Sequence, residues 1–394
     1  MKVLAVHNRY QQPGGEDRVF DSETDLLRSR GHEVLTFVKD NDSIRGAGRW
    51  AVARGAVFSR SCAEELAALM RENPGIDVAH FHNTFPLISS SGYLACRSAG
   101  VSVVQTLHNY RPICPKGTLR RSGSPCESCV GRSVALPAVL HRCYRGSWPG
   151  SLVAAGNSWM QLQMAAKRNW IDLYIAPTEF VKKKFVEGGF PESKIVVQPH
   201  GVFPDPGAGN TAREFALFAG FLVEDKGPAV LLEAWRRLSG VPLKIAGDGP
   251  LLQSCRAMAE AIAAPIEFLG HCDQEKLLRL MRAAKFLVVP SLFFETMGMV
   301  VLEAFACATP VIASDLGALA EVIEDARTGL LFKAGDAAAL SEKVRWALRH
   351  EEALARMGRA CRLEYERRYN ADAHYAGLSS IYGRVLEKNR RDLD

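Results

Sequence analysis

The sequence predicts an α/β protein built from two doubly wound parallel sheets, each covered by helices on both faces. Short apolar runs alternate with longer amphipathic stretches from one end of the chain to the other. The amphipathic stretches are long enough for the right-handed crossovers that join parallel strands. At 394 residues the chain exceeds one compact core, so two or three domains are expected.

The elements follow in order along the chain. In the first half the expected strands are 2–7, 33–38, 77–82, 101–107, 172–176 and 194–197. In the second half they are 215–220, 242–246, 266–269, 285–290 and 310–313. The helical patterns between them include 17–30, 226–238, 273–283 and 337–348. From about residue 350 the chain has few Gly or Pro and is expected to be wholly helical.

Prolines and glycines cluster between residues 199 and 210, after one set of strands and before the next. The predicted domains are therefore 1–200 and 201–365, with a helical tail, 366–394, that packs back toward the first domain. A cleft between two such domains is the expected place for a ligand. Residues 108–160 interrupt the strand and helix rhythm, and so long an irregular segment usually has a function of its own.

Composition and charge narrow the class of protein. Hydrophobic residues make up 47%, and neither a targeting segment nor an apolar stretch of membrane-spanning length is apparent, so a cytoplasmic protein with reduced cysteines is expected. Residues 1–200 hold 25 Lys and Arg against 17 Asp and Glu. This excess favours an anionic partner, either the inner face of a membrane or a phosphate-bearing substrate, although a solvated basic face explains it equally well. Nucleic acid is not expected, since no recognised binding motif is present.

The stretch SLFFETMGMVVLE, residues 291–303, places two carboxylates eight residues apart in an apolar setting. Glu295 falls in the loop after strand 285–290, and Glu303 falls inside the next helix. Open α/β sheets bind ligands where strands end and helices begin, and a carboxylate can accept two hydroxyl hydrogen bonds. Glu295 could instead complement the helix dipole. Its apolar neighbours argue against a solvated Glu303.

Two further loops of the second half carry candidate residues. Lys226 and Gly227 precede a helix, so Lys226 and the free amides of that helix could face an anion together. Gly247 closes a strand in a Gly-Asp-Gly-Pro turn, which alone is a weak signal.

The segment PSLFFETMGMVVLEAFACATPVIAS resembles the nucleotide-sugar-binding core of family-four glycosyltransferases. FAGFLVEDKG, GDGP, GGED, RGHEV, HFHN and QTLHNYRPICP extend the resemblance over nearly the whole chain. It implies the GT-B fold, with two Rossmann-like domains facing a central cleft. It also implies a retaining hexosyltransferase that needs no metal or other cofactor for catalysis. Its partners would be a UDP- or GDP-linked sugar donor and a glycan or lipid-linked acceptor in cell-surface polysaccharide assembly.

Carried over by position, the resemblance makes His108 and Glu295 the catalytic residues beside the donor sugar. Glu303 would hold the ribose and Lys226 would neutralise the diphosphate. The remaining donor-binding positions are Gly220, Gly247, Met297, Gly298, Met299 and Val300. Phe221 stands where the family commonly has Arg, and Thr296 where it has glycine, so rearranged diphosphate contacts are expected.

On the acceptor side, Gly14 and Gly15 precede a helix in a loop that lets the backbone approach a substrate closely, with a simple tight turn as the alternative. His82 and Asn109 follow two expected strands and complete the acceptor-side set. Histidines are more often structural than functional, so His82 and His108 depend on their position at strand ends.

Cys114, Cys126, Cys129 and Cys143 lie within residues 108–160 in the spacing C-x11-C-x2-C-x13-C. Four thiolates could bind a structural zinc ion, which would stabilise a segment that has few apolar residues. Reduced buried thiols are the competing explanation. For the whole protein, a nucleotide-sugar epimerase and a catalytically silent sugar-nucleotide-binding protein remain alternatives to a transferase.

Overall fold

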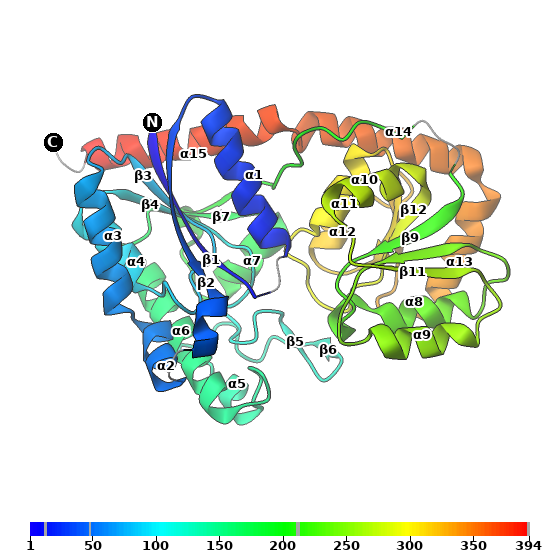
Figure 1. The fold of residues 1–394 in the computed structure, drawn as a ribbon, viewed down its shortest axis with the longest axis horizontal. Helices are drawn as coiled ribbons and strands as arrows, with labels where there is room; N and C mark the ends of the chain where they lie inside the picture. The colour runs from blue at the N-terminus through cyan, green and yellow to red at the C-terminus, as the bar shows by residue number, and fades with distance from the viewer. Residues whose placement is uncertain (12–13, 47–48, 210–212, 392–394) are drawn as a thin grey trace. The chain divides into compact units, whose positions relative to one another are not determined.

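The computed structural model describes residues 1–11, 14–46, 49–209 and 213–391 (Figure 1). Its contacts divide the chain into two compact units. Unit 1 comprises Met1–Leu119, Cys126–Pro199 and His374–Asp394, and unit 2 comprises Arg120–Pro125 and His200–Ala373. The short excursion of residues 120–125 into unit 2 has no signal in the sequence beyond its charge.

Unit 1 contains a six-stranded parallel sheet in the order β2-β1-β3-β4-β7-β8. Its strands are β1 (Lys2–Arg9), β2 (Glu33–Asp40), β3 (Val78–Phe81), β4 (Ser102–Thr106), β7 (Leu173–Ala176) and β8 (Ile195–Val197). The longer helices are α1 (Gly15–Ser29), α2 (Arg49–Val57), α3 (Arg60–Glu72), α4 (Ser91–Ser98), α6 (Trp148–Gln163) and α7 (Glu179–Glu187). Each expected strand of the first half is present.

The last helix, α15 (Ala371–Arg391), completes the core of unit 1 (Figure 1). Apolar side chains of α15 pack with those of the central strands in one buried cluster, which includes Val3, Val104, Leu378 and Tyr382. The expected helical tail is thus present, but as two helices, α14 (Glu351–Arg368) and α15. Between them the side chain of Asn370 accepts a hydrogen bond from the backbone of Ala373 (2.8 Å), a cap that begins a new helix.

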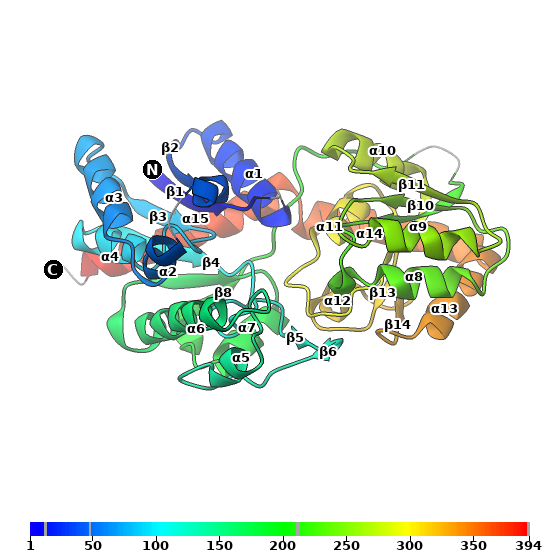
Figure 2. The same cartoon turned by 60° about the horizontal axis from the view of Figure 1, so that its bottom comes forward.

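Unit 2 contains a second six-stranded parallel sheet in the order β11-β10-β9-β12-β13-β14. Its strands are β9 (Phe215–Ala219), β10 (Leu243–Ala246), β11 (Ile266–Gly270), β12 (Ala284–Val289), β13 (Val311–Ser314) and β14 (Gly329–Phe332). The helices are α8 (Pro228–Trp235), α9 (Leu252–Glu260), α10 (Gln274–Ala283), α11 (Met299–Ala306), α12 (Ala318–Val322), α13 (Ala337–Arg349) and α14. Figure 2 shows α8 and α9 side by side along one face of this sheet.

The strand orders locate the ligand-binding edge of each sheet. In a doubly wound sheet the chain reverses its direction of winding at a switch point, and the loops that leave the two strands there diverge and form a crevice. This point lies between β1 and β3 in unit 1 and between β9 and β12 in unit 2. The residues that follow these strands are therefore the first candidates for a site.

Candidate functional site

Three loops at the carboxyl edge of the unit 2 sheet are held together by backbone hydrogen bonds. The amide of Leu222, after β9, donates to the carbonyl of Asp248, after β10 (2.8 Å). The amide of Leu292, after β12, donates to the carbonyl of Asp225 (2.8 Å). These bonds join loops far apart in the sequence into one frame beside the switch point.

Two glycines permit this close approach. A Cβ atom on Gly247 would lie 1.9 Å from the carbonyl oxygen of Gly220, and one on Gly227 would lie 1.9 Å from that of Pro290. Gly227 also has a φ of +69°, which disfavours any other residue. The predicted donor-side residues Gly220 and Gly247 thus lie in contact.

Lys226 and Glu295 meet across the switch point. Nζ of Lys226 lies 2.6 Å from Oε1 of Glu295, and the hydroxyl of Ser291 donates to the same oxygen (2.7 Å). Glu295 is 7% exposed, whereas the Lys226 side chain is 32% exposed and lies over the ring of Phe293. The structure therefore brings together a cation and a carboxylate that the sequence assigned to one ligand.

Helix α11 begins at this edge with Gly298 as its N-terminal cap, at a φ of +75°. The first amides of a helix, here those of Met299 and Val300, have no acceptor within the helix and are available to an anion. The side chain of Met297 is buried in the core, and its sulfur accepts from the amide of His200 (3.4 Å). The side chain of Met297 thus contributes to packing of the core.

Glu303 lies one turn into α11 and is buried, at 3% exposure. Its Oε1 accepts a hydrogen bond from Nε2 of Gln274, the first residue of α10 (2.9 Å). Burial agrees with the apolar neighbours of Glu303 in the sequence. Gln274 was missed because only the fold brings α10 and α11 together.

Arg120 is a second cation beside the Lys226 loop that sequence reasoning missed. Its side chain is 2% exposed, pairs with Glu224 (3.0 Å) and also bonds Asp225. Burial alone would lower the pKa of the guanidinium, but the two carboxylates outweigh it and raise that pKa. Phe221, where the family commonly has Arg, is 40% exposed.

In unit 1, two histidines lie together after β3 and β4. Nδ1 of His82 is 2.9 Å from Nε2 of His108, and the rings are nearly parallel. Both histidines line a small pocket with Asn83, Asn109 and Arg111. The pocket brings three predicted residues, His82, His108 and Asn109, to one place.

Behind this pair lies a buried carboxylate, Glu23, surrounded by histidines. Its Oε1 is 3.0 Å from Nδ1 of His80 and 3.5 Å from Nε2 of His82. Its Oε2 is 3.1 Å from Nε2 of His374, whose Nδ1 faces the carbonyl of Pro199 (2.9 Å). Both ring nitrogens of His374 therefore face oxygen atoms, one of Glu23 and one of the backbone. Burial raises the pKa of Glu23, but the histidines more than offset it and leave that pKa well below its usual value.

Ligand atoms of Glu23, His80 and His82 lie within 4.8 Å of one another, a spacing that could hold a metal ion. However, His80 directs Nδ1 to the hydroxyl of Tyr382 and Nε2 to that of Thr106, both at 2.8 Å. A hydrogen-bonded network therefore accounts for the arrangement without an ion. One hint of this network was present in the sequence, since Glu23 lies on the apolar face of its helix with Phe20 and Leu27.

The glycine loop after β1 leads into α1. Gly14 caps that helix, and its amide donates to Asp17 (2.8 Å), which also bonds His7 (2.8 Å). A Cβ atom on Gly14 would have nothing within 4 Å. The role of Gly14 and Gly15 in substrate approach stays a prediction, and residues 12 and 13 lie outside the described part.

Asn109 faces the same loop. Its side-chain amide lies 3.4 Å from the hydroxyl of Tyr10 and 3.5 Å from Oε2 of Glu16. Burial raises the pKa of the Glu16 carboxyl. Asn109 thus connects this partly buried loop with the pocket that His82 also lines.

None of the ten cysteines, all of which the structure describes, forms a disulfide. Cys129 and Cys143 pack against the same small cluster of Ala135, Ala138 and Ala155. Burial and the neighbouring thiols of Cys114, Cys143 and Cys126 together raise the pKa of Cys129 to about 11. The other three thiols thus lie near enough to affect Cys129, but among the described residues no three of these cysteines have their sulfur atoms all within 4.8 Å of one another.

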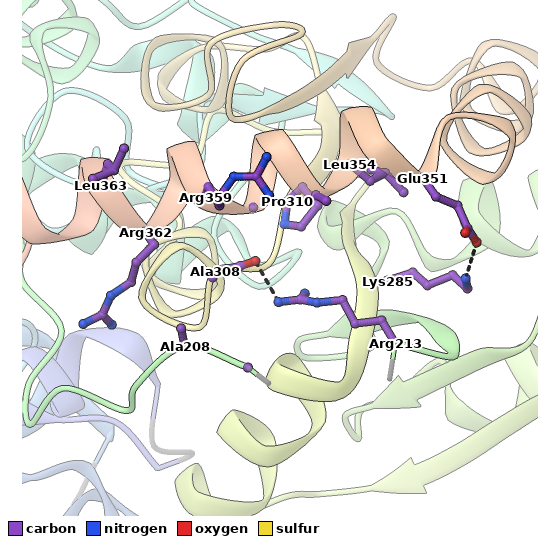
Figure 3. Close-up of a pocket in the computed structure, with 13 residues that line it drawn as sticks. Ala208, Arg213, Lys285, Ala308, Pro310, Glu351, Leu354, Arg359, Arg362 and Leu363 are labelled. Carbon is purple, nitrogen blue, oxygen red and sulfur yellow. Dashed lines mark hydrogen bonds and ion pairs between the residues drawn. The ribbon is translucent and has the colours of Figure 1, made fainter. Parts of the chain in front are cut away.

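One pocket of unit 2 lies away from this chemistry (Figure 3). It has a volume of about 700 Å³ and is lined by Lys285, near the start of β12, and Pro310, just before β13, so it opens at the amino edge of the sheet. Arg213, which also lines it, donates to the carbonyls of Ala284 (2.9 Å) and Ala308 (2.8 Å). We therefore place the candidate site at the opposite, carboxyl edge.

Within the described residues, no helix combines the length and the apolar character needed to cross a bilayer.

Comparison with known families gives two matches that together span most of the chain. Residues 13–205 match the model of Glycosyltransferase Family 4, and residues 204–364 match that of Glycosyl transferases group 1. An uncharacterized glycosyltransferase of Methanocaldococcus jannaschii is 28% identical over 54% of this chain and 59% of its own length. A phosphatidyl-myo-inositol mannosyltransferase of Mycobacterium leprae is 35% identical over 41% and 43%, respectively. The chain thus spans 59% of the length of the first relative and 43% of the second.

Solved structures with the same fold cover nearly the whole chain. Sucrose-phosphate synthase of Thermosynechococcus elongatus superposes with a TM-score of 0.74 at 16% identity, over 98% of this chain and 99% of that one. The Anabaena HepE protein in complex with UDP and glucose gives 0.70 at 15% identity, over 97% and 99%. At such identities the likeness establishes the GT-B fold alone.

Proposed function

We propose, for a chain that belongs to the group 1 and family 4 glycosyltransferases, that it transfers a sugar from a nucleoside diphosphate to an acceptor with retention of configuration. The observation that carries the proposal is the pairing of Lys226 with Glu295 at the β9/β12 switch point, beside the first amides of α11. A cation and helix amides suit a diphosphate, and a carboxylate suits sugar hydroxyls. Structures of the same fold that hold UDP and glucose support such a donor.

In the proposed reaction Lys226 leaves Glu295 and pairs with the diphosphate. Glu295 then accepts hydroxyl hydrogen bonds from the sugar, Glu303 holds the ribose, and His108 orients the sugar, as the family resemblance implies. The acceptor hydroxyl attacks the anomeric carbon on the face from which the diphosphate departs. The bond from that carbon to the phosphate oxygen breaks, and the acceptor proton passes to the leaving diphosphate. The protein supplies positioning and charge stabilisation, with no covalent intermediate.

The test is a screen of UDP- and GDP-sugars for hydrolysis and transfer by the purified chain. The Glu295→Ala variant should lose turnover, whereas Glu275→Ala, an exposed carboxylate paired only with Arg279, should not. If the wild-type protein binds a donor tightly but does not turn it over with any acceptor, the enzyme proposal is wrong and a silent binding protein is favoured. Interconversion of one nucleotide sugar into another would instead identify an epimerase.

For the acceptor we propose a glycan or a lipid-linked sugar used in cell-surface polysaccharide assembly. The proposal is supported by the basic excess of the first half and by the similarity to the M. leprae relative, which is named a phosphatidyl-myo-inositol mannosyltransferase. Transfer to lipid-linked acceptors in detergent, compared with free oligosaccharides, tests this choice.

A structural zinc ion bound by Cys114, Cys126, Cys129 and Cys143 is a separate proposal. It is supported by their spacing and by the proximity of the other three thiols to Cys129. Metal analysis of the purified protein should find about one zinc per chain, and Cys129→Ser should lose it while Cys272→Ser, elsewhere in the chain, keeps it. Protein free of zinc after expression in zinc-supplemented medium would remove the proposal.

A further inference from the structure

An unusual share of exposed apolar surface lies on two adjacent helices of unit 1. Of the twelve large apolar side chains that are exposed among the described residues, six fall between residues 134 and 159. They are Val134 (55% exposed), Leu136 (55%), Leu140 (56%), Trp148 (45%), Leu152 (64%) and Trp159 (42%). All lie on or beside α5 (Leu136–Leu140) and α6 (Trp148–Gln163), which pack against each other (Figure 2).

On α6 the exposed apolar residues form a single stripe. Trp148, Leu152 and Trp159 are four and eleven positions apart, so at 3.6 residues per turn they lie within about 40° of one another. The buried positions of α6 carry small or polar residues, Ser151, Ala154, Ala155, Asn157, Ser158 and Gln161. This helix therefore directs its large apolar side chains away from the core, the reverse of an ordinary surface helix.

Basic side chains are the only charged groups of this segment. Residues 128–171 contain no Asp or Glu, and their five Lys and Arg are all exposed: Arg132, Arg142, Arg145, Lys167 and Arg168. The guanidinium of Arg142 lies 5.4 Å from the centre of the Trp148 ring, and that of Arg168 lies 5.3 Å from the centre of the Trp170 ring. Cationic groups of this segment therefore lie against aromatic rings, and one of them, Arg142, lies against a residue of the stripe.

We propose that this surface, the α5–α6 surface formed by these six apolar and five basic side chains, docks unit 1 on an anionic phospholipid bilayer. Trp and Leu enter the boundary between headgroups and acyl chains, while Lys and Arg attract anionic headgroups. A second copy of the chain fits less well, because it would bring an equally basic surface against the first. The inference deepens the proposed function by placing the acceptor in a membrane, and vesicle binding can be measured without turnover.

Flotation with vesicles tests the proposal on the full chain. Wild-type protein should float with vesicles of phosphatidylcholine and phosphatidylglycerol and far less with phosphatidylcholine alone. The triple variant Trp148→Gln, Leu152→Gln, Trp159→Gln should partition at least about tenfold more weakly, because it loses the inserted apolar area. The matched control Trp346→Gln, Leu363→Gln removes exposed apolar residues of unit 2 and should bind as the wild type does.

The basic component is tested apart from the apolar one. Arg132→Gln combined with Arg142→Gln should reduce binding to the anionic vesicles and weaken its dependence on salt. Thermal melting of each variant confirms that these exposed positions leave the fold intact.

Three results would overturn the docking proposal. They are a wild-type chain that ignores anionic vesicles, a triple variant that binds as well as the wild type, and a lipid-free wild-type dimer that the triple variant converts to monomers. The proposed transferase activity is judged separately, since transfer to an acceptor in detergent solution should be unchanged in the triple variant. If the chain binds vesicles but transfers no sugar, the proposed function is wrong and the docking proposal is still supported.

Discussion

The two switch points of the molecule are built in different ways. In unit 2 the polar residues belong to continuous stretches, the loops after β9, β10 and β12, whose backbones bond directly to one another. In unit 1 the polar residues come from separate elements, with Glu23 on α1, His80 on β3 and His374 on α15, and they are joined through side chains. A motif in the sequence can reveal the first kind of site, whereas only the fold reveals the second.

The two carboxylates at these points also differ in what surrounds them. Glu295 pairs with a lysine that is one-third exposed, so water can replace that partner. Glu23 is paired with histidines that are almost wholly buried, where water has no access. We therefore expect Glu23 to act on stability and Glu295 to act on turnover.

The largest expected effect is on folding, from Glu23→Gln. Removing the charge leaves the three buried histidines around Glu23 without their carboxylate, which should cost about 3–5 kcal/mol of unfolding free energy. Urea denaturation measures this loss, with Glu33→Gln, an exposed partner of Lys2, as the control. A loss no greater than that of the control would mean that the network is not a buried ion pair.

The next largest effect distinguishes Gly247, at the carboxyl edge of the unit 2 sheet, from Gly14, in the loop after β1 of unit 1. Gly247→Ala would place a methyl group against the carbonyl of Gly220, so the loops must move apart at a cost of about 1–3 kcal/mol. The affinity of Gly247→Ala for the donor, measured by calorimetry, should also fall. Gly14→Ala has open space and should change stability by no more than about 0.5 kcal/mol. Equal effects of the two substitutions would erase this distinction.

Lys226→Met should change stability little and activity strongly. The pair with Glu295 is partly exposed, so its loss should cost less than about 1 kcal/mol. If Lys226 neutralises a diphosphate, the KM for the donor should nonetheless rise, while Lys333→Met, an exposed lysine, leaves it unchanged. An unchanged KM in Lys226→Met would remove the lysine from the donor site.

The smallest expected effect is the change with pH in the stability that Glu23 contributes. The pKa of Glu23 is held well below its usual value of 4.5, so its contribution is complete above pH 4.5 and is lost as the pH falls through the lower folded-state value. The stability difference between wild type and Glu23→Gln should therefore shrink as the pH falls below about 4.5. Denaturation curves from about pH 5 downward measure it, and a difference that stays the same as the acid becomes stronger would contradict the lowered pKa of Glu23.

The strands were largely predictable because apolar runs bounded by turn residues mark the buried strands of a parallel sheet. Each strand expected from the sequence is present, whereas β14, the short run Gly329–Phe332, was missed. A four-residue apolar run after Thr328 does not stand out from a loop. The hairpin of β5 (Arg120–Arg121) and β6 (Ser124–Pro125) was also missed, because its contacts with unit 2 are long-range.

The residues of the candidate site were predictable where short stretches of sequence contain them. Lys226, Glu295 and Glu303 were found from their loops and from resemblance, and the fold places the first two in contact. Gln274 and Arg120 could not be found in this way, since each reaches the site from an element remote in sequence. The same reason hid the link from His82 to Glu23.

Helix α15 has a consequence for the order in which the molecule can form during synthesis. Unit 2 is nearly continuous, so most of its contacts can form once residue 373 has left the ribosome. The core of unit 1 includes Leu378, Tyr382 and Val385, and its ion pair includes His374. The half of the protein that is translated first must therefore wait for the final helix, and until then it exposes the sheet surface that α15 will cover.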